Sequence, residues 1–239
     1  KRFPSLVSYS SNSITKNAKG AGSFRDNANN IFNFVATRTD IFQLASGTFT
    51  SRKSGLTGGE TDFFTFTQFG NYVIASNGVD QPQYYLMGTS TNFANLNAIQ
   101  SAGTTPLFRV SGVVRDFLVS GNISTATNRI HWSGINDISA WSGKQSDFQD
   151  LPGSGGKIVH LTSGEVGWAT IFRFSVISPN RGAVYGQTVC QDNRDVFFYS
   201  DDGFYQINGD SVAPIGVEKV NRFFDLDLNK AYTDRIKAA

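Results

Sequence analysis

The sequence contains few of the residues on which reactive and metal-binding sites are usually built. Its 239 residues include one cysteine, Cys190, and two histidines. A single cysteine excludes an internal disulfide framework and a cysteine-built zinc site. Apolar runs are only a few residues long and the first residues show no secretory signal, so we expect a soluble chain with no membrane span.

The sequence also lacks a strong excess of charge of either sign. Lysine and arginine number 21 against 19 aspartate and glutamate residues, which gives a formal net charge of +2. Basic runs are no longer than Arg52-Lys53, whereas tight nucleic-acid binding depends on clustered cations that neutralise phosphates. The charge pattern therefore argues against a high-affinity nucleic-acid-binding protein.

Glycine and phenylalanine are abundant, with 24 and 21 copies beside a single methionine. Aromatic side chains favour half-buried pleated surfaces, and glycine with Asn, Asp and Ser favours the turns between strands. Short apolar or alternating runs recur between such turns, as at 31–36, 63–69 and 72–76. Helical spacing is not sustained before residue 210. Composition and periodicity together predict an all-β fold.

A weak internal repeat adds detail to this prediction. In each copy a polar residue is followed by an apolar strand, a polar turn and a second strand with aromatics. The copies lie at 70–88, 115–134 and 194–210. The step from Tyr72 to Asp116 is 44 residues. The step from Asp116 to Asp195 is 79 residues, nearly twice that length. A fourth unit that starts at 157–161 therefore fits between the last two copies. One four-stranded blade of a β-propeller uses about 40–50 residues.

The repeat favours a β-propeller of four-stranded blades over residues 1–216. A generic β-sandwich is the alternative that turn spacing alone leaves open, although sandwiches do not need hairpin units at a blade-sized period. An apolar i, i+3, i+6, i+7 pattern that starts at Val217 predicts a short helical segment within 217–239. A propeller closes by pairing its last sheet with its first. We therefore expect the propeller to be incomplete in this chain, with a further blade or domain beyond it.

Candidate catalytic residues are few, and each has a structural explanation. His131 and Cys190 lie in predicted strands and His160 lies in an alternating run, so no nucleophile can be paired with a base. The stretch at 201–203 is similar to the aspartate box of sialidase-type propellers but lacks its intervening residue, and an Asp-Gly turn explains it. We predict that the protein is not an enzyme and has no catalytic, cofactor-binding or metal-binding residues.

Residues 128–156 hold two of the three tryptophans, one histidine and three aspartates. An active site, a sugar-binding platform and a connection between two sheets are the three interpretations. In the second, Trp132 and Trp141 stack against a sugar, with Asp137 or Asp147 as the acid. The protein would then be a carbohydrate-binding or carbohydrate-cleaving propeller on a phage or cell surface.

The third interpretation of this region is the one we favour, because no second catalytic group can be named beside its aspartates. It makes 129–133 an outer strand of one blade and 135–141 a turn whose tryptophan packs back against that strand. Residues 148–156 then cross to the next blade. The aspartates serve as turn formers in this interpretation.

Three stretches, taken in order, resemble one protein family. They are FGNYVIASNGVDQPQY at 69–84, NRIHWSGIND with Trp141 and FQDLP within 128–152, and NRG, DDGFY and PIGVEKV within 180–220. Their order and spacing resemble the tail hub or nozzle proteins of short-tailed bacteriophages, also called packaged-DNA stabilisation proteins. The resemblance covers roughly residues 60–239. The sequence departs from the family at 170–174, where a further strand pair is usual.

The resemblance implies a structural virion protein without catalytic residues. Copies of such a chain form a homo-oligomeric ring, expected to be a hexamer, below the portal and its adaptor proteins. The ring retains packaged DNA, lines the channel through which double-stranded DNA passes as cargo, and holds tail fibre, spike or needle proteins. The expected location is the virion tail, after assembly in the cytoplasm of a host bacterium. A near-neutral chain suits passage of DNA better than its capture, since each phosphate neutralised by a fixed cation adds affinity.

Overall fold

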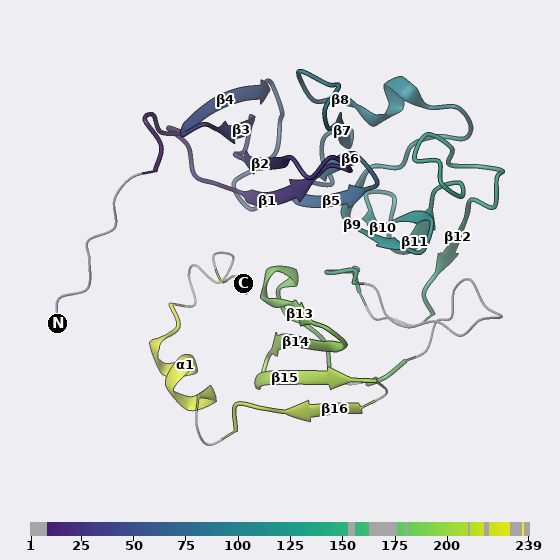
Figure 1. Ribbon diagram of the computed structural model, residues 1–239. Coiled ribbons are helices and arrows are strands. Elements are labelled where there is room, and N and C mark those ends of the chain that lie inside the picture. The colour runs from purple at the N-terminus through teal and green to yellow at the C-terminus, as the bar shows by residue number, and fades with distance from the viewer. Residues whose placement is uncertain are drawn as a thin grey trace. The chain divides into compact units, whose positions relative to one another are not determined.

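Four antiparallel sheets of four strands each make up most of the regular structure in the computed structural model (Figure 1). The structure describes residues 9–152, 156–162, 176–179, 181–209, 211–217, 220–229 and 236. Each strand of a sheet pairs with the next strand in the sequence, so every sheet is a simple meander. Three sheets lie in one unit, Lys1–Asp150, and the fourth lies in a second unit, Leu151–Ala239.

The strands have the following bounds. The first sheet comprises β1 (Gly20–Arg25), β2 (Ile31–Ala36), β3 (Ile41–Ala45) and β4 (Thr48–Lys53), and the second comprises β5 (Thr65–Phe69), β6 (Tyr72–Ser76), β7 (Gln83–Leu86) and β8 (Ala94–Asn95). The third comprises β9 (Phe108–Val114), β10 (Phe117–Ile123), β11 (Ala126–Trp132) and β12 (Asp147–Asp150). The fourth comprises β13 (Cys190–Asp192), β14 (Asp195–Ser200), β15 (Gly203–Asn208) and β16 (Ser211–Pro214). The helical elements of the described residues are the 3-10 helices η1 (Leu96–Ile99) and η2 (Gly186–Thr188) and the α-helix α1 (Asn221–Asp227).

The second sheet is buried on both faces. Along β6, Val73 and Ala75 belong to an apolar core shared with the first sheet, and Ile74 belongs to a core shared with the third sheet. All three side chains are fully shielded from solvent. Successive residues of a strand point to opposite faces, so a strand covered on both sides needs apolar residues at consecutive positions. This explains the uninterrupted run at 72–76.

The first strands of the three sheets in Lys1–Asp150 follow one another in space: β1 contacts β5, and β5 contacts β9 (Figure 1). Thr67 Oγ1 of β5 lies 2.8 Å from Ser111 Oγ of β9 in buried surroundings. Beyond the ends of β1 and β5, the Asn27 amide donates to Asn71 Oδ1 at 3.0 Å. Each of these pairs is 44 residues apart in the sequence. Equivalent positions of adjacent sheets are therefore in contact, at the step that the repeat predicts.

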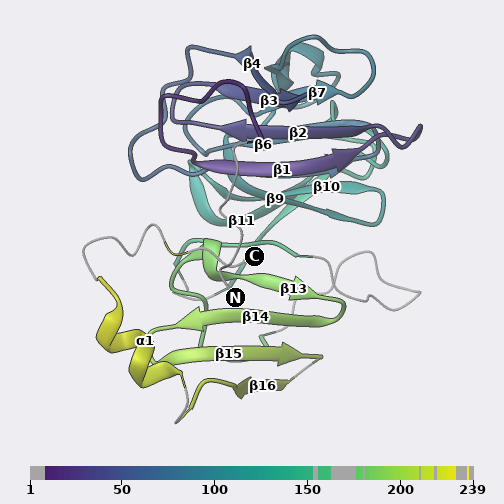
Figure 2. The same cartoon turned by 60° about the vertical axis from the view of Figure 1, so that its left-hand side comes forward.

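Helix α1 lies beside the sheet of the second unit, near the end where β14 turns into β15 (Figure 2). Phe224 of α1 makes edge-on contacts with Tyr199 of β14 and Phe204 of β15, at ring-centroid distances of 5.1 and 5.0 Å. Val196 of β14 and Ile207 of β15 are cross-strand partners on the opposite face. They line a cavity of about 340 Å³ within this unit.

The all-β prediction is confirmed, and so is much of its detail. β2 and β6 have the predicted bounds, and the second strands of the four sheets start at 31, 72, 117 and 195, which gives steps of 41, 45 and 78 residues. The Asp-Gly turn at 201–203 joins β14 to β15, and α1 forms inside the predicted helical segment. None of the described helices is both long and apolar enough for a membrane crossing.

Two expectations for the chain after residue 128 are wrong. Residues 129–133 are not an outer strand, because β12 pairs with β11 and forms the edge of the same sheet instead of crossing to the next one. All four residues of β12 are exposed, so no apolar alternation marks it in the sequence. Residues 157–161 are irregular instead of extended. A strand needs backbone partners, and within the described ranges no strand pairs with this run. The rest of the expected fourth unit, at 163–175, lies outside the described residues and includes the junction at 170–174.

Candidate functional site

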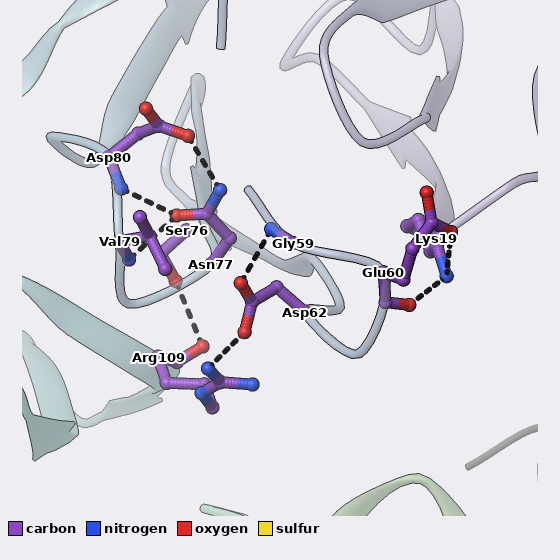
Figure 3. Close-up of polar contacts among 9 residues, drawn as sticks. All are labelled: Lys19, Gly59, Glu60, Asp62, Ser76, Asn77, Val79, Asp80 and Arg109. Carbon is purple, nitrogen blue, oxygen red and sulfur yellow. Dashed lines mark hydrogen bonds and ion pairs between the residues drawn. The ribbon is translucent and has the colours of Figure 1, made fainter. Parts of the chain in front are cut away.

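Charged and amide side chains gather at one end of the unit Lys1–Asp150, where β1 begins, β6 ends and β9 begins (Figure 3). A meander brings these connections to the same end of each sheet, because every strand reverses direction. The group, which we call the end cluster, comprises Lys19, Gly59, Glu60, Asp62, Ser76, Asn77, Val79, Asp80 and Arg109. It combines the chain entering β1, the β4–β5 connection, the β6–β7 turn and β9.

Arg109 and Asp62 form an ion pair that joins the third sheet to the β4–β5 connection. Arg109 Nη2 lies 2.5 Å from Asp62 Oδ1, and the Gly59 amide donates to Asp62 Oδ2 at 2.7 Å. Burial disfavours the charged form of Asp62, but the Gly59 hydrogen bond and the Arg109 guanidinium outweigh it and hold the pKa of the carboxyl below its usual range. Asp62 is therefore ionised at neutral pH and unsuited to act as a general acid.

Asn77 orders the β6–β7 turn. Its Oδ1 accepts hydrogen bonds from the amides of Val79 and Asp80 at 3.0 and 2.9 Å, and its Nδ2 donates to Asp80 Oδ2 at 2.8 Å. Gly78 has a φ of 79°, in the left-handed region that glycine adopts without steric cost. Asp80 also accepts from Thr57 Oγ1 at 2.6 Å, which ties the turn to the β4–β5 connection. The short Asn77 side chain thus supplies hydrogen-bond partners to backbone amides of the turn.

The Glu60 carboxylate lies near two cationic side chains that come from different elements. Arg38 Nη1 lies 2.8 Å from Glu60 Oε1, and Lys19 Nζ lies 3.8 Å from Glu60 Oε2. Lys19 also donates to the backbone oxygen of Glu60. The Lys19 side chain is only 9% exposed, whereas that of Glu60 is 71% exposed. A buried ammonium is therefore held by a carboxylate that lies largely in solvent.

The end cluster fixes the connections of three sheets relative to one another within the unit. Ser76 Oγ donates to Arg109 O at 3.2 Å and so adds a direct contact between β6 and β9. The carboxylates of Asp62 and Asp80 accept from backbone amides, a hydroxyl and a guanidinium. Such an arrangement suits a rigid scaffold better than proton transfer, which needs a group whose pKa lies near the working pH.

The two tryptophans of the alternative, sugar-platform interpretation are both at least half-buried. Trp141 is 3% exposed and packs against Phe108 and His131, at ring-centroid distances of 5.9 and 5.2 Å. Trp132 is half-buried at the end of β11, and its Nε1 donates to Gln145 O at 2.8 Å. The prediction that the tryptophan at 141 packs back against the preceding strand is confirmed, and this burial leaves its ring without an open face for a sugar.

The aspartates proposed as acids beside those tryptophans have other surroundings. Asp137 Oδ2 lies 2.6 Å from Lys144 Nζ, and Asp137 Oδ1 accepts from the Ser139 amide at 2.9 Å. Burial opposes ionisation, but Lys144 and Ser139 together hold the pKa of Asp137 below its usual range. Asp147 is exposed at the start of β12, where its Oδ1 accepts from the Phe148 amide at 2.8 Å. Asp137 thus stabilises a turn, as the third interpretation of this region predicts.

The remaining candidates are distributed over both units. His131 lies within β11, as predicted, and its Nε2 is 3.2 Å from Trp141 O. Burial lowers the pKa of His131, although this hydrogen bond favours the protonated form. His160 is exposed in an irregular stretch, and Cys190 is the half-buried first residue of β13. Asp202, in the β14–β15 turn, forms an ion pair with Arg181. In the part of the chain that the structure describes, no group of three or more His, Cys, Asp and Glu residues is placed to hold a metal ion.

Sequence reasoning missed the end cluster. Lys19 and Glu60 form no run and match no motif, and they meet only because adjacent sheets bring their ends together. The available signal is the repeat itself: Lys19 and Glu60 are 41 residues apart, close to one repeat step. Pairing opposite charges one step apart would have identified this contact.

Comparisons with known proteins leave the family of the chain open. No protein-family model matches it, and no curated protein matches it either. Among solved structures, the chain is similar to one described as "Crystal structure of the computationally designed Ika4 protein". The identity is 14% and the TM-score 0.38, over 85% of this chain and 94% of that chain. A TM-score this low carries no argument, so the description of the fold rests on the four sheets themselves.

Proposed function

We propose that this chain is a structural protein of the tail of a short-tailed bacteriophage. In this proposal it forms the hub or nozzle ring, a homo-oligomer and specifically a hexamer, below the portal and its adaptor proteins. The ring retains packaged double-stranded DNA and lines the channel through which the genome leaves, and it holds fibre, spike or needle proteins. The chain is a partial β-propeller, acts without catalytic residues, and works in the virion after assembly in the host cytoplasm.

The observation that carries the proposal is the regular repetition of one sheet. Four meanders with the same strand order recur at steps of 41, 45 and 78 residues, the last close to twice the others. Contacts between residues 44 apart join adjacent sheets, as expected for consecutive blades. Blade-like sheets provide the broad rigid sides that a closed ring of identical subunits requires.

The distribution of charge supports passage of DNA over its capture. Arg109 of the end cluster is paired with Asp62, and Arg129 of β11 is paired with Asp150. A cation already engaged by a carboxylate neutralises a DNA phosphate less effectively, so such pairs limit the affinity for passing DNA. The link to phage tails itself comes from the motifs within residues 69–84, 128–152 and 180–220.

The test is the assembly state of the full-length purified protein, measured by mass photometry with and without the purified adaptor ring. The expected result is a hexameric species that forms a larger complex with the adaptor. Cryo-electron microscopy of mature particles should then show the ring below the adaptor. The proposal would be falsified by a stable monomer that does not bind the adaptor, or by absence of the chain from mature virions.

The carbohydrate-binding alternative gains no support from the described geometry, because Trp141 is buried. A glycan array separates the two functions directly. Glycan binding that is lost in Trp132→Ala would revive the alternative, whereas the hub proposal expects no glycan signal for either the parent protein or the variant.

A further inference from the structure

A cavity of about 310 Å³ lies beside the end cluster, and its lining is rich in cations. The described residues that line it are Thr15, Lys16, Asn17, Lys19, Arg38 and Glu60, and we call this cavity the Lys19 pocket. Three of the six residues are basic and one is acidic. The volume falls at the lower end of the range for small-molecule sites, about 300–1,000 Å³.

The charges of the pocket are unequally satisfied. Lys16 has a partner outside the lining, because its Nζ lies 2.8 Å from Asp40 Oδ2. Lys19 and Arg38 instead share the single carboxylate of Glu60. Asp62 also attracts Lys19, but it is paired with Arg109. At the Glu60 carboxylate, two positive charges therefore face one negative charge. A dianion in place of that carboxylate would balance Lys19 and Arg38 fully.

Lys19 is the residue for which this imbalance has the largest cost. Its side chain is 9% exposed, and its Nζ lies 3.8 Å from the Glu60 carboxylate, beyond hydrogen-bond distance. Lys19 Nζ donates a hydrogen bond to the backbone oxygen of Glu60, and the centroid of the Phe63 ring lies 5.3 Å away. A buried ammonium is stable only when a negative charge or several acceptors compensate for its lost hydration.

Glu60 is able to leave the pocket at small cost. Its side chain is 71% exposed and projects from the β4–β5 connection instead of a strand. An exposed ion pair contributes about 0–1 kcal/mol to stability, so the Arg38 contact does not hold the carboxylate firmly. The carboxylate thus occupies the place of an external anion.

We propose that the Lys19 pocket binds a phosphate dianion, either inorganic phosphate or the phosphate of a small monoester, and that Glu60 is the internal anion which it displaces. Arg38 offers the planar fork that matches phosphate oxygens, and Lys19 offers a largely buried point charge. Thr15 and Asn17 add neutral donors to the lining. This inference does not depend on the proposed tail function.

The experiment is a titration of the full-length protein with inorganic phosphate at constant ionic strength, followed by amide NMR shifts. Shifts are expected at residues 15–19, 38 and 60. Glu60→Gln removes the competing carboxylate and keeps the backbone oxygen that Lys19 contacts, so its affinity for phosphate should rise about tenfold, the scale of one charge-assisted hydrogen bond. Unchanged or weaker binding in Glu60→Gln overturns the proposal.

Two further variants separate the pocket from general surface charge. Arg38→Gln, at a side chain that is 48% exposed and tolerant of change, should weaken binding about tenfold. The matched control is Lys144→Gln, which removes a cation that is likewise ion-paired, at 2.6 Å from Asp137. The control should leave the affinity unchanged. Equal losses in both variants mean diffuse electrostatic attraction and overturn the site.

A ligand series tests the requirement for a dianion and its source. Methyl phosphate should bind within a few-fold of inorganic phosphate if a monoester is accepted, and a clear preference for inorganic phosphate assigns the site to the free ion. Dimethyl phosphate and acetate, which carry one charge, should bind at least about tenfold more weakly. Acetate binding as tight as that of phosphate overturns the dianion assignment.

Discussion

The sheet β5–β8 and the sheet β13–β16 have the same strand order and very different surroundings. In β6, four of the five residues are buried, because the first and third sheets cover both of its faces. In β14, three of the six residues are buried, with Phe224 of helix α1 against Tyr199 and a cavity on the opposite face. Similar apolar strands therefore acquire different burial from their neighbours, and local sequence alone does not set the stability of a sheet.

Individual connections also differ in how crowded they are, within each unit as well as between units. In Lys1–Asp150 the connection before β9 packs directly against the chain near Trp141, where the Trp141 amide donates to Ala102 O at 2.7 Å. In Leu151–Ala239 the turn at Gly209 has open space around it. We expect crowded connections to tolerate substitution less than open ones.

The largest expected effect comes from Gly103→Ala. Gly103 has a φ of 67°, and an added Cβ would lie 2.5 Å from the carbonyl carbon of Trp141. Left-handed strain and backbone crowding together should lower the free energy of unfolding of this unit by about 3 kcal/mol. The matched control is Gly209→Ala, at a φ of 57° with nothing nearby, which should cost only about 1 kcal/mol. Chemical denaturation read by hydrogen exchange of β9–β11 and β13–β16 measures both, and equal losses would contradict the crowding argument.

The next effect compares two valines at the second position of equivalent strands, Val73 in β6 and Val196 in β14. Val73 is fully buried between sheets, so Val73→Ala should destabilise its unit by about 2 kcal/mol through lost burial and an unfilled cavity. Val196 is half-buried beside an existing cavity, so Val196→Ala should cost less than about 1 kcal/mol. The same hydrogen-exchange measurement applies. A larger loss at Val196 would mean that its face is covered more completely than the described residues indicate.

The smallest effect concerns pH and His131. Burial lowers the pKa of His131 in the folded state, so the unfolded chain takes up the proton more readily. The stability of the first unit should therefore fall as the pH drops below about 6.5, the usual histidine value, and this loss should be absent in His131→Gln. Denaturation between pH 7 and pH 5, read at β10–β11, checks the slope. His160→Gln, in the other unit, is the control and should leave that slope unchanged.

Much of the fold follows from the sequence because turns and alternation are local signals. The runs at 31–36 and 72–76 became strands with the predicted bounds, and the repeat step recurs as contact between sheets. β12 was not predicted, because all its residues are exposed and its sequence has no apolar pattern. It is a strand because the chain places it next to β11, with which it pairs. The end cluster was missed for a similar reason. Which carboxylate meets Lys19 depends on which sheet lies next to β1, and no local motif records that.

The contact between Thr67 and Ser111 also has a consequence for how the chain acquires its structure. Within the first unit, the first sheet packs against the second and the second packs against the third. Each sheet there can therefore pack against a neighbour that is close in the sequence. A chain emerging from the ribosome can complete one meander, expose its apolar side only until the next meander emerges, and continue in this way. Short-lived exposure of apolar surface limits aggregation during synthesis, and stepwise growth of this kind accommodates the addition of a further sheet without disturbing those already formed.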